Sequence, residues 1–173
     1  AANVSGTFNL GRTASTTLTN TNVLAGGLLT GVGTLTGNIN NSGTVAPGNS
    51  PGIINVVGNF TQNAAGMLNM EVGGTTAGAG HDRIAVGGNT VLDGTLNVLQ
   101  FGGYLPAPPE RLQIITTTGS NTGAFTTVIV GATAAPAGTA TPLFITSDRG
   151  PACLVGDMEL LFYPKGVPIA VPK

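Results

Sequence analysis

The densest cluster of titratable side chains in this sequence is the tripeptide His81-Asp82-Arg83. An imidazole beside a carboxylate could act as an acid–base pair or supply two metal ligands. A metal site needs three or four ligands, however, and no Ser or Cys nucleophile accompanies the pair in a recognisable motif. We therefore expect Asp82 to cap the turn before a strand at residues 84–86, with His81 and Arg83 solvated.

The remaining acidic residues are too dispersed to build a catalytic groove. Enzymes on β-helical folds that act on acidic polysaccharides need clustered Asp with Lys or Arg, to bind calcium and abstract a proton. A repeat-type calcium site needs Gly-Gly-x-Gly-x-Asp, and "GGTTAGAGHD" does not fit it. We expect no enzymatic activity, no metal and no cofactor. The acidic residues stand singly along the chain, at Glu71, Asp82, Asp93, Glu110, Asp148, Asp157 and Glu159.

The composition indicates a neutral, association-prone surface. Charged residues make up 8% of the 173 residues, against about 25% in an ordinary soluble domain. A formal net charge of -1 leaves little repulsion between copies. The six Lys and Arg residues form no basic stripe for nucleic acid, and no apolar run is long enough for a transmembrane helix.

Short strands are the elements that must position these side chains. Glycine interrupts every helix-like window, whereas "MLNMEV" alternates with Leu68, Met70 and Val72 on one face. "GTLNVLQF" alternates in the same way, with Leu96 and Val98 on one face. The pattern predicts an all-β chain.

The strands recur in units that begin with Gly-Asn, at Gly37, Gly58 and Gly88. Their unequal spacing suits the coils of a parallel β-helix with loops of variable length. Coils in such a fold stack about 4.8 Å apart, with aliphatic side chains piled inside and Thr and Asn ladders outside.

The stretch "APGNSPG" interrupts this pattern with two Pro-Gly pairs, Pro47-Gly48 and Pro51-Gly52. Proline followed by glycine suits a type II turn. We predict two such turns in tandem, forming a wide, stiff corner between Val45 and Ile53.

We therefore predict a parallel β-helix (β-solenoid) over residues 1–100, followed by a β-rich cap over residues 101–173 that ends in an extended, proline-containing tail. Strand candidates in the second part are residues 112–117, 125–130, 143–146 and 158–163. The single cysteine, Cys153, is either buried and inert or able to bridge two copies. The frequent burial of free cysteine favours the first alternative.

Four stretches carry a resemblance to a known family: "GTVAPGNSPGIINVVGNFTQ", "GMLNMEVGGTTAGAGHDRIAV", "TVLDGTLNV" and "LQIITTTGSNTGAFTTV". In this order they resemble the autotransporter-associated β-strand repeat of passenger-type exported bacterial surface proteins. The resemblance implies a right-handed parallel β-helix, a secreted or cell-surface location, and a structural or adhesive role. It places no catalytic residues in this chain. The small residues Ala1-Ala2 at the start suit a removed signal peptide or an excised fragment.

The two ends of the chain are the candidate assembly segments. In "NVSGTFNLG", Val4 and Phe8 fall on one side of a possible strand that Leu10 continues. This strand is either an ordinary first coil or a strand added to the edge of a neighbouring copy, which would give an open fibre. In the tail, the apolar residues of interest are Phe162, Ile169 and Val171.

These features predict an extracellular bacterial structural protein, a self-assembling subunit of a surface filament or layer. The expected partners are other copies of the chain, and secondly polysaccharide of the cell surface or matrix. The alternative is an adhesive or stalk module cut from a larger autotransporter-like passenger protein.

Overall fold

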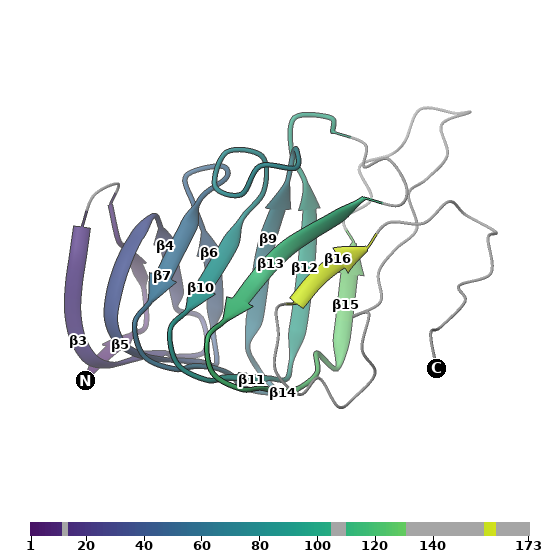
Figure 1. Ribbon diagram of the computed structural model, residues 1–173. Helices are drawn as coiled ribbons and strands as arrows, with labels where there is room; N and C mark the ends of the chain where they lie inside the picture. The colour runs from purple at the N-terminus through teal and green to yellow at the C-terminus, as the bar shows by residue number, and fades with distance from the viewer. Residues whose placement is uncertain (12–13, 105–109, 131–157, 162–173) are drawn as a thin grey trace.

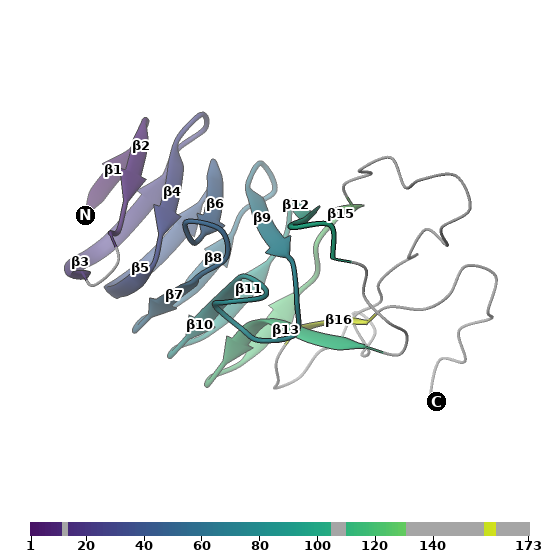
Figure 2. The ribbon, with the colours of Figure 1, turned by 90° about the horizontal axis from the view of Figure 1, so that it is seen from above.

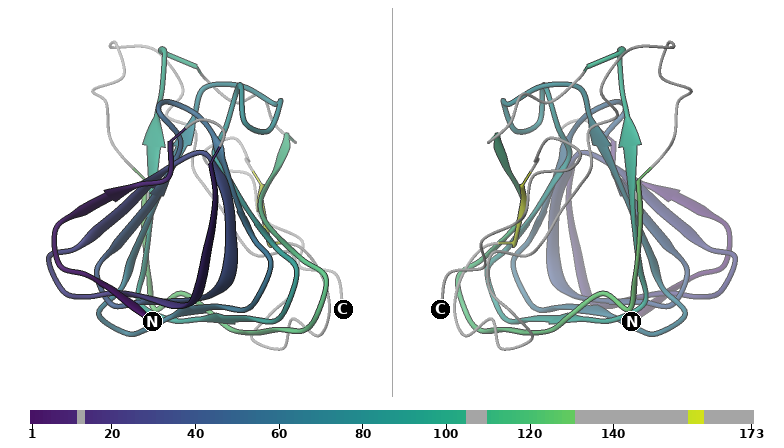
Figure 3. Two further views of the ribbon diagram at one scale, coloured as in Figure 1. Left: turned by 90° about the vertical axis from the view of Figure 1, so that its left-hand side faces the viewer. Right: turned by 90° about the vertical axis from the view of Figure 1, so that its right-hand side faces the viewer.

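The computed structural model describes residues 1–11, 14–104, 110–130 and 158–161, and this part of the chain contains strands and turns but no helix. The strands follow one another as coils of a solenoid (Figure 1). Seen along the solenoid axis, each coil has three sides (Figure 3). The prediction of an all-β parallel β-helix is confirmed.

Two of the three sides belong to one ten-stranded sheet, because two long strands bend around the corner between them. The first residues of β5 pair with β7 and its last residues pair with β8. Every pairing in this sheet is parallel except that of the last strand, β16. Its strands are β1 (Ala2–Val4), β3 (Ala14–Val23), β5 (Gly33–Asn41), β7 (Ile53–Val56), β8 (Phe60–Gln62), β10 (Arg83–Val86), β11 (Thr90–Leu92), β13 (Arg111–Thr117), β14 (Asn121–Gly123) and β16 (Met158–Leu161).

The third side is a six-stranded sheet in which every neighbour is parallel. From the N-terminal end to the C-terminal end its strands follow the chain order, as the view from above shows (Figure 2). They are β2 (Thr7–Asn9), β4 (Leu28–Gly31), β6 (Thr44–Pro47), β9 (Met67–Val72), β12 (Thr95–Gln100) and β15 (Thr127–Val130).

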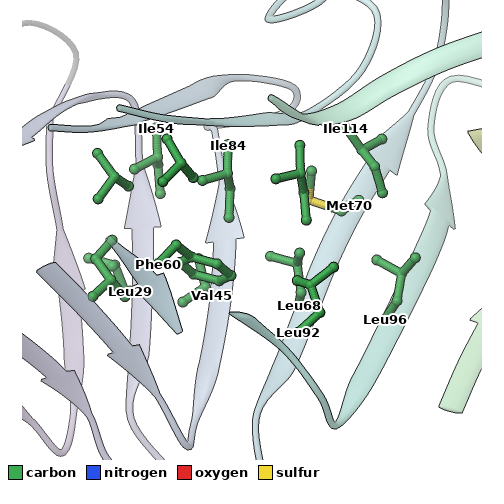
Figure 4. Packing of buried hydrophobic residues seen from close by; sticks show 14 of the residues in the cluster. Leu29, Val45, Ile54, Phe60, Leu68, Met70, Ile84, Leu92, Leu96 and Ile114 are labelled. Atoms are coloured by element: carbon green, nitrogen blue, oxygen red, sulfur yellow. The ribbon is translucent and has the colours of Figure 1, made fainter. Parts of the chain in front are cut away.

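Aliphatic side chains fill the interior in stacks that run along the solenoid (Figure 4). The predicted faces of two strands are confirmed, because β9 and β12 both alternate buried and partly exposed residues over their first four positions. Stacking removes each apolar side chain from water between its neighbours above and below, which is the main source of stability in such a fold. The fully buried residues include Leu29, Ile54, Phe60, Leu68, Ile84 and Leu96.

The predicted Gly-Asn units stack at one corner of the coil. The backbone N–H of Gly58 donates to the carbonyl oxygen of Gly37 (3.1 Å), and that of Gly88 donates to the carbonyl oxygen of Gly58 (2.9 Å). The side-chain oxygens of Asn38, Asn59 and Asn89 each accept the backbone N–H of the next coil, and that of Asn20 accepts from the side-chain amide of Asn38. The resulting ladder contains Asn20, Asn38, Asn59, Asn89 and Ser120, with spacings of 18, 21, 30 and 31 residues. The unequal period is confirmed, and the coils lengthen toward the C-terminal end.

The corner at Pro47 to Gly52 is confirmed, but one of its two predicted type II turns is wrong. The segment leads from β6 in the six-stranded sheet to β7 in the ten-stranded sheet. Gly48 has the positive φ that a type II turn requires (95°), whereas Gly52 has none and Ser50 adopts φ 73° instead. Gly52 must be a glycine because neighbouring atoms lie very close to it: a Cβ there would collide with the Gly48 backbone and the Val32 side chain.

Parallel coils continue past residue 100, where the boundary between coils and cap is expected. β13 pairs with β10, β14 with β11 and β15 with β12, all in parallel. β16 then pairs antiparallel with β13. Three of the predicted strands therefore form close to their expected positions, while the strand at 143–146, Cys153 and the proline-containing tail lie outside the described residues. No helix in the described segments has the length and apolar character to cross a membrane.

Candidate functional site

The N-terminal assembly residues occupy two strands rather than one. Val4 ends β1, which pairs with β3 in the ten-stranded sheet, and Phe8 is the middle residue of β2, which pairs with β4 in the six-stranded sheet. The chain bends at Ser5-Gly6 between them. The prediction of a single strand is wrong because the segment rounds a corner of the coil, which a two-residue alternation does not reveal.

Val4, Phe8 and Leu10 nevertheless form one layer, the last layer of the core at this end. Val4 and Leu10 are buried, and Phe8 is partly buried against the core. In register, Val4 lies beside Val23 and Phe8 beside Leu29. The layer has apolar neighbours on its inner side, so its outer side is where a further coil would stack.

The outer edges of β1 and β2 have no paired strand among the described residues. Their residues, Ala-Asn-Val and Thr-Phe-Asn, include no charged residue and no proline. Monomeric proteins commonly protect such edges with Lys, Pro or a bulge, because unpaired N–H and C=O groups recruit other chains. This end, at the left of Figure 1, is chemically open to strand addition.

The C-terminal end of the solenoid presents a second open edge. β16 covers β13, but β14 and β15 each have only one neighbour in the described part of the chain. On β15, Val128 is 41% exposed although its register partner on β12, Leu96, is 1% exposed. Val128 is not among the assembly residues predicted from the sequence, although the alternation in "TTVIV" places it on the same side as Val130. The three tail residues Phe162, Ile169 and Val171 lie outside the described residues.

The tripeptide His81-Asp82-Arg83 ends the loop between β9 and β10. The prediction that His81 is solvated is wrong, because His81 and Asp82 are both fully buried. The ring nitrogens of His81 lie 3.1 Å from the Gly74 carbonyl oxygen and 3.2 Å from that of Gln113. Arg83 is half-buried, and its Nε donates to the same Gln113 carbonyl at 3.0 Å.

Asp82 binds the backbone of neighbouring segments instead of capping its own turn. Its Oδ1 accepts the N–H of Gly52 and its Oδ2 accepts the N–H of Glu71, both at 2.7 Å. Burial raises the pKa of Asp82 to about 7, while these two hydrogen bonds lower the pKa and the nearby Glu71 carboxylate raises it. The carboxylate thus connects the loop to the corner of the preceding coil.

Burial also lowers the pKa of His81, and the positive charge of Arg83 adds to this effect in a minor way. A neutral imidazole has one N–H and can donate to only one of the two carbonyls that face it. Because both side chains are committed to backbone groups, the pair serves to fasten the loop. The described residues contain no group of three or more side chains suited to a metal ion. The lack of enzymatic activity stays a prediction.

No protein family model matches the sequence, and no curated protein matches it. The resemblance to the autotransporter-associated repeat therefore stays a prediction from the residues.

Proposed function

We propose that this chain is an extracellular structural protein of bacterial type, a subunit that assembles with copies of itself into a surface filament or layer. The observation that carries the proposal is the uncharged edge formed by β1 and β2, which no strand of the described residues covers and which lies over an apolar end layer. A neighbouring copy that adds strands to this edge would satisfy its backbone groups and cover Phe8.

Stacking of coils explains the geometry better than donation of a strand. β1 and β2 already pair with β3 and β4 of their own chain, so giving them away would uncover Val23 and Leu29. Addition to the outer edge loses none of these contacts. The joint we propose therefore extends the solenoid from one copy to the next.

A second copy also fits the surface better than polysaccharide does. Sugar-binding faces commonly use exposed aromatic rings, and Phe101 is the only aromatic among the large exposed hydrophobic side chains of the described residues. Export and a cell-surface location rest on the composition and on the family resemblance.

The alternative function is a stalk or adhesive module within a longer passenger protein. The same edge favours it, because a preceding coil of the same chain would pair with β1 and β2 in the same way. The two functions differ in whether separate copies join.

Electron microscopy of the purified chain distinguishes them. We expect long regular fibres or layers, whereas dispersed 17.1 kDa particles at all concentrations would overturn self-assembly and leave the stalk.

Two variants locate the assembly edge. Phe8→Asp should abolish the polymer, because it puts a charge in the end layer, while Phe101→Asp, on a partly exposed phenylalanine far from this end, should not. Thr7→Lys provides a test that leaves the core intact, because Thr7 is exposed and a lysine protects an edge strand. Fibres that form unchanged in both Phe8→Asp and Thr7→Lys would place assembly elsewhere on the molecule.

A further inference from the structure

The six-stranded sheet contains one inward ladder of side chains that runs from end to end. Parallel pairing places each member beside the next: Phe8, Leu29, Val45, Leu68, Leu96 and Val128. The four inner members are 0–1% exposed, whereas Val128 is 41% exposed and Phe8 is partly buried. Within the described segments, the inner members of the ladder have a neighbour on both sides, whereas Phe8 and Val128 have one on a single side.

The inference drawn from this ladder rests on the proposed function and specifies where two copies join. We infer that β15 of one copy pairs in parallel with β2 of the next copy, so that Val128 stacks on Phe8. The same register sets Thr127 beside Thr7 and Ile129 beside Asn9, because β2 and β15 occupy equivalent places in the sheet.

The side chains on the two edges match at this register. Val128 lies in register beside the buried Leu96 and Phe8 beside the buried Leu29, which puts both apolar side chains on the inner face of the sheet. An aliphatic–aromatic neighbour pair stabilises a sheet. Thr7 and Thr127 end a second ladder, so the joint sets one threonine beside another. Neither edge contains a charged residue that would repel the other.

A second copy is the occupant that this geometry selects. A strand that adds to β15 in parallel needs an inward apolar residue beside Val128, and Phe8 on β2 takes this position beside Leu29 on β4. At the C-terminal end β16 covers β13, so that β14 and β15 are the strands open to a further copy among the described residues. Joining two different ends does not close, so it produces a filament.

A pair of valines of equal exposure tests the joint. Val128→Asp should lower the fraction of protein in fibres at least tenfold, because the carboxylate would sit in the joint without a partner. Val91→Asp is the matched control and should leave the fibre fraction unchanged, since Val91 is 42% exposed on β11, which is paired on both sides. Fibres that survive Val128→Asp would overturn the inferred joint.

A disulfide between copies tests the register. In a Cys153→Ser background, Asn9→Cys with Ile129→Cys should form covalent multimers under oxidation, because neighbouring parallel strands bring Cα atoms within the range a disulfide spans, about 4.4–6.8 Å. The control pair, Asn3→Cys with Ile129→Cys, joins β1 and β15 in different sheets and should stay monomeric on a non-reducing gel.

The two hypotheses fail in different ways. If the unmodified chain forms no fibres, the proposed function itself is wrong. If it forms fibres but the Asn9–Ile129 cysteine pair gives no more cross-linked product than the control pair, self-assembly stands and the inferred joint is overturned.

Discussion

Asp82 links parts of the chain that are far apart in the sequence. Its two oxygens accept backbone N–H groups of Gly52 and Glu71, while His81 beside it faces carbonyl oxygens of Gly74 and Gln113. Two adjacent buried residues thus fasten the longest described loop to the coils on both sides. These hydrogen bonds hold the loop in place, although the residue types alone would suit catalysis.

The raised pKa of Asp82 predicts a pH-dependent free energy of unfolding. The folded pKa, about 7, lies above the ordinary value of 3.8, so the folded state holds the proton more tightly. The stability from this group is complete below about pH 4 and falls as pH rises toward 7. We expect the unfolding free energy of the wild type to fall by about 2–3 kcal/mol relative to that of Asp82→Asn from pH 5 to pH 7.5, measured by urea denaturation.

The asparagine variant isolates this effect because it removes only the titrating carboxyl. His81, whose lowered pKa makes the fold lose stability as pH falls below 6.5, is present in both proteins and cancels in the difference. A difference that stays constant over this range would show that Asp82 is ionised throughout.

The sequence identifies the cluster of titratable residues but not its burial. A short motif of His, Asp and Arg is typical of a solvated turn, and no neighbouring residue indicates that "GGTTAGAGHDR" folds back onto two coils. The partners of Asp82 and His81 are backbone atoms between 7 and 32 residues away. Because almost every residue type has the same backbone N–H and C=O groups, such partners cannot be recognised from the sequence.

The close stacking of the Gly-Asn units at the corner of the coil limits which substitutions the chain tolerates there. A Cβ on Gly58 would lie 2.5 Å from the Asn38 side-chain oxygen and 2.6 Å from the Gly37 carbonyl oxygen. Gly58 has no positive φ, so a glycine is required at this position by the close approach of the coils and not by the backbone conformation.

Gly58→Ala should therefore destabilise the protein by about 1–3 kcal/mol, because the coils must separate to admit the methyl group. Gly6→Ala is the control, since a Cβ there meets no atom within 4 Å and Gly6 also has an ordinary φ. Urea unfolding midpoints of the two variants compare them directly, and equal midpoints would contradict the crowded corner.

Most of the elements could be predicted because alternation and repetition are local signals. The faces of β9 and β12 and the Gly-Asn repeat followed from the sequence for that reason. The bend at Ser5-Gly6 and the ordinary φ of Gly52 did not, since each depends on packing against another coil. The open edge at Val128 required the register of β15 against β12.

At the scale of the whole molecule, low charge predicts assembly that is insensitive to salt. The strands that would form the joint, β2 and β15, contain no charged residue, so screening removes no attraction between them. The fraction of protein in fibres should change by less than about twofold between about 0.05 and 0.5 M NaCl, as measured by sedimentation. Dissolution of the fibres by salt would point to charged groups outside these strands.

The inferred joint also fixes the length that each copy adds to a fibre. Six parallel strands spaced by about 4.8 Å give an axial repeat of about 29 Å. Fourier transforms of electron micrographs would show this repeat as a layer line, and a repeat well outside that length would be incompatible with end-to-end coils.

The lengthening of successive coils, from 18 to 31 residues along the Asn ladder, makes the two ends of the solenoid unlike. In a fibre of such units joined end to end, every unit points the same way. The fibre would therefore be polar, and its two tips would grow at different speeds. Attached by one tip, it would present the same chemistry at its free end however long it became.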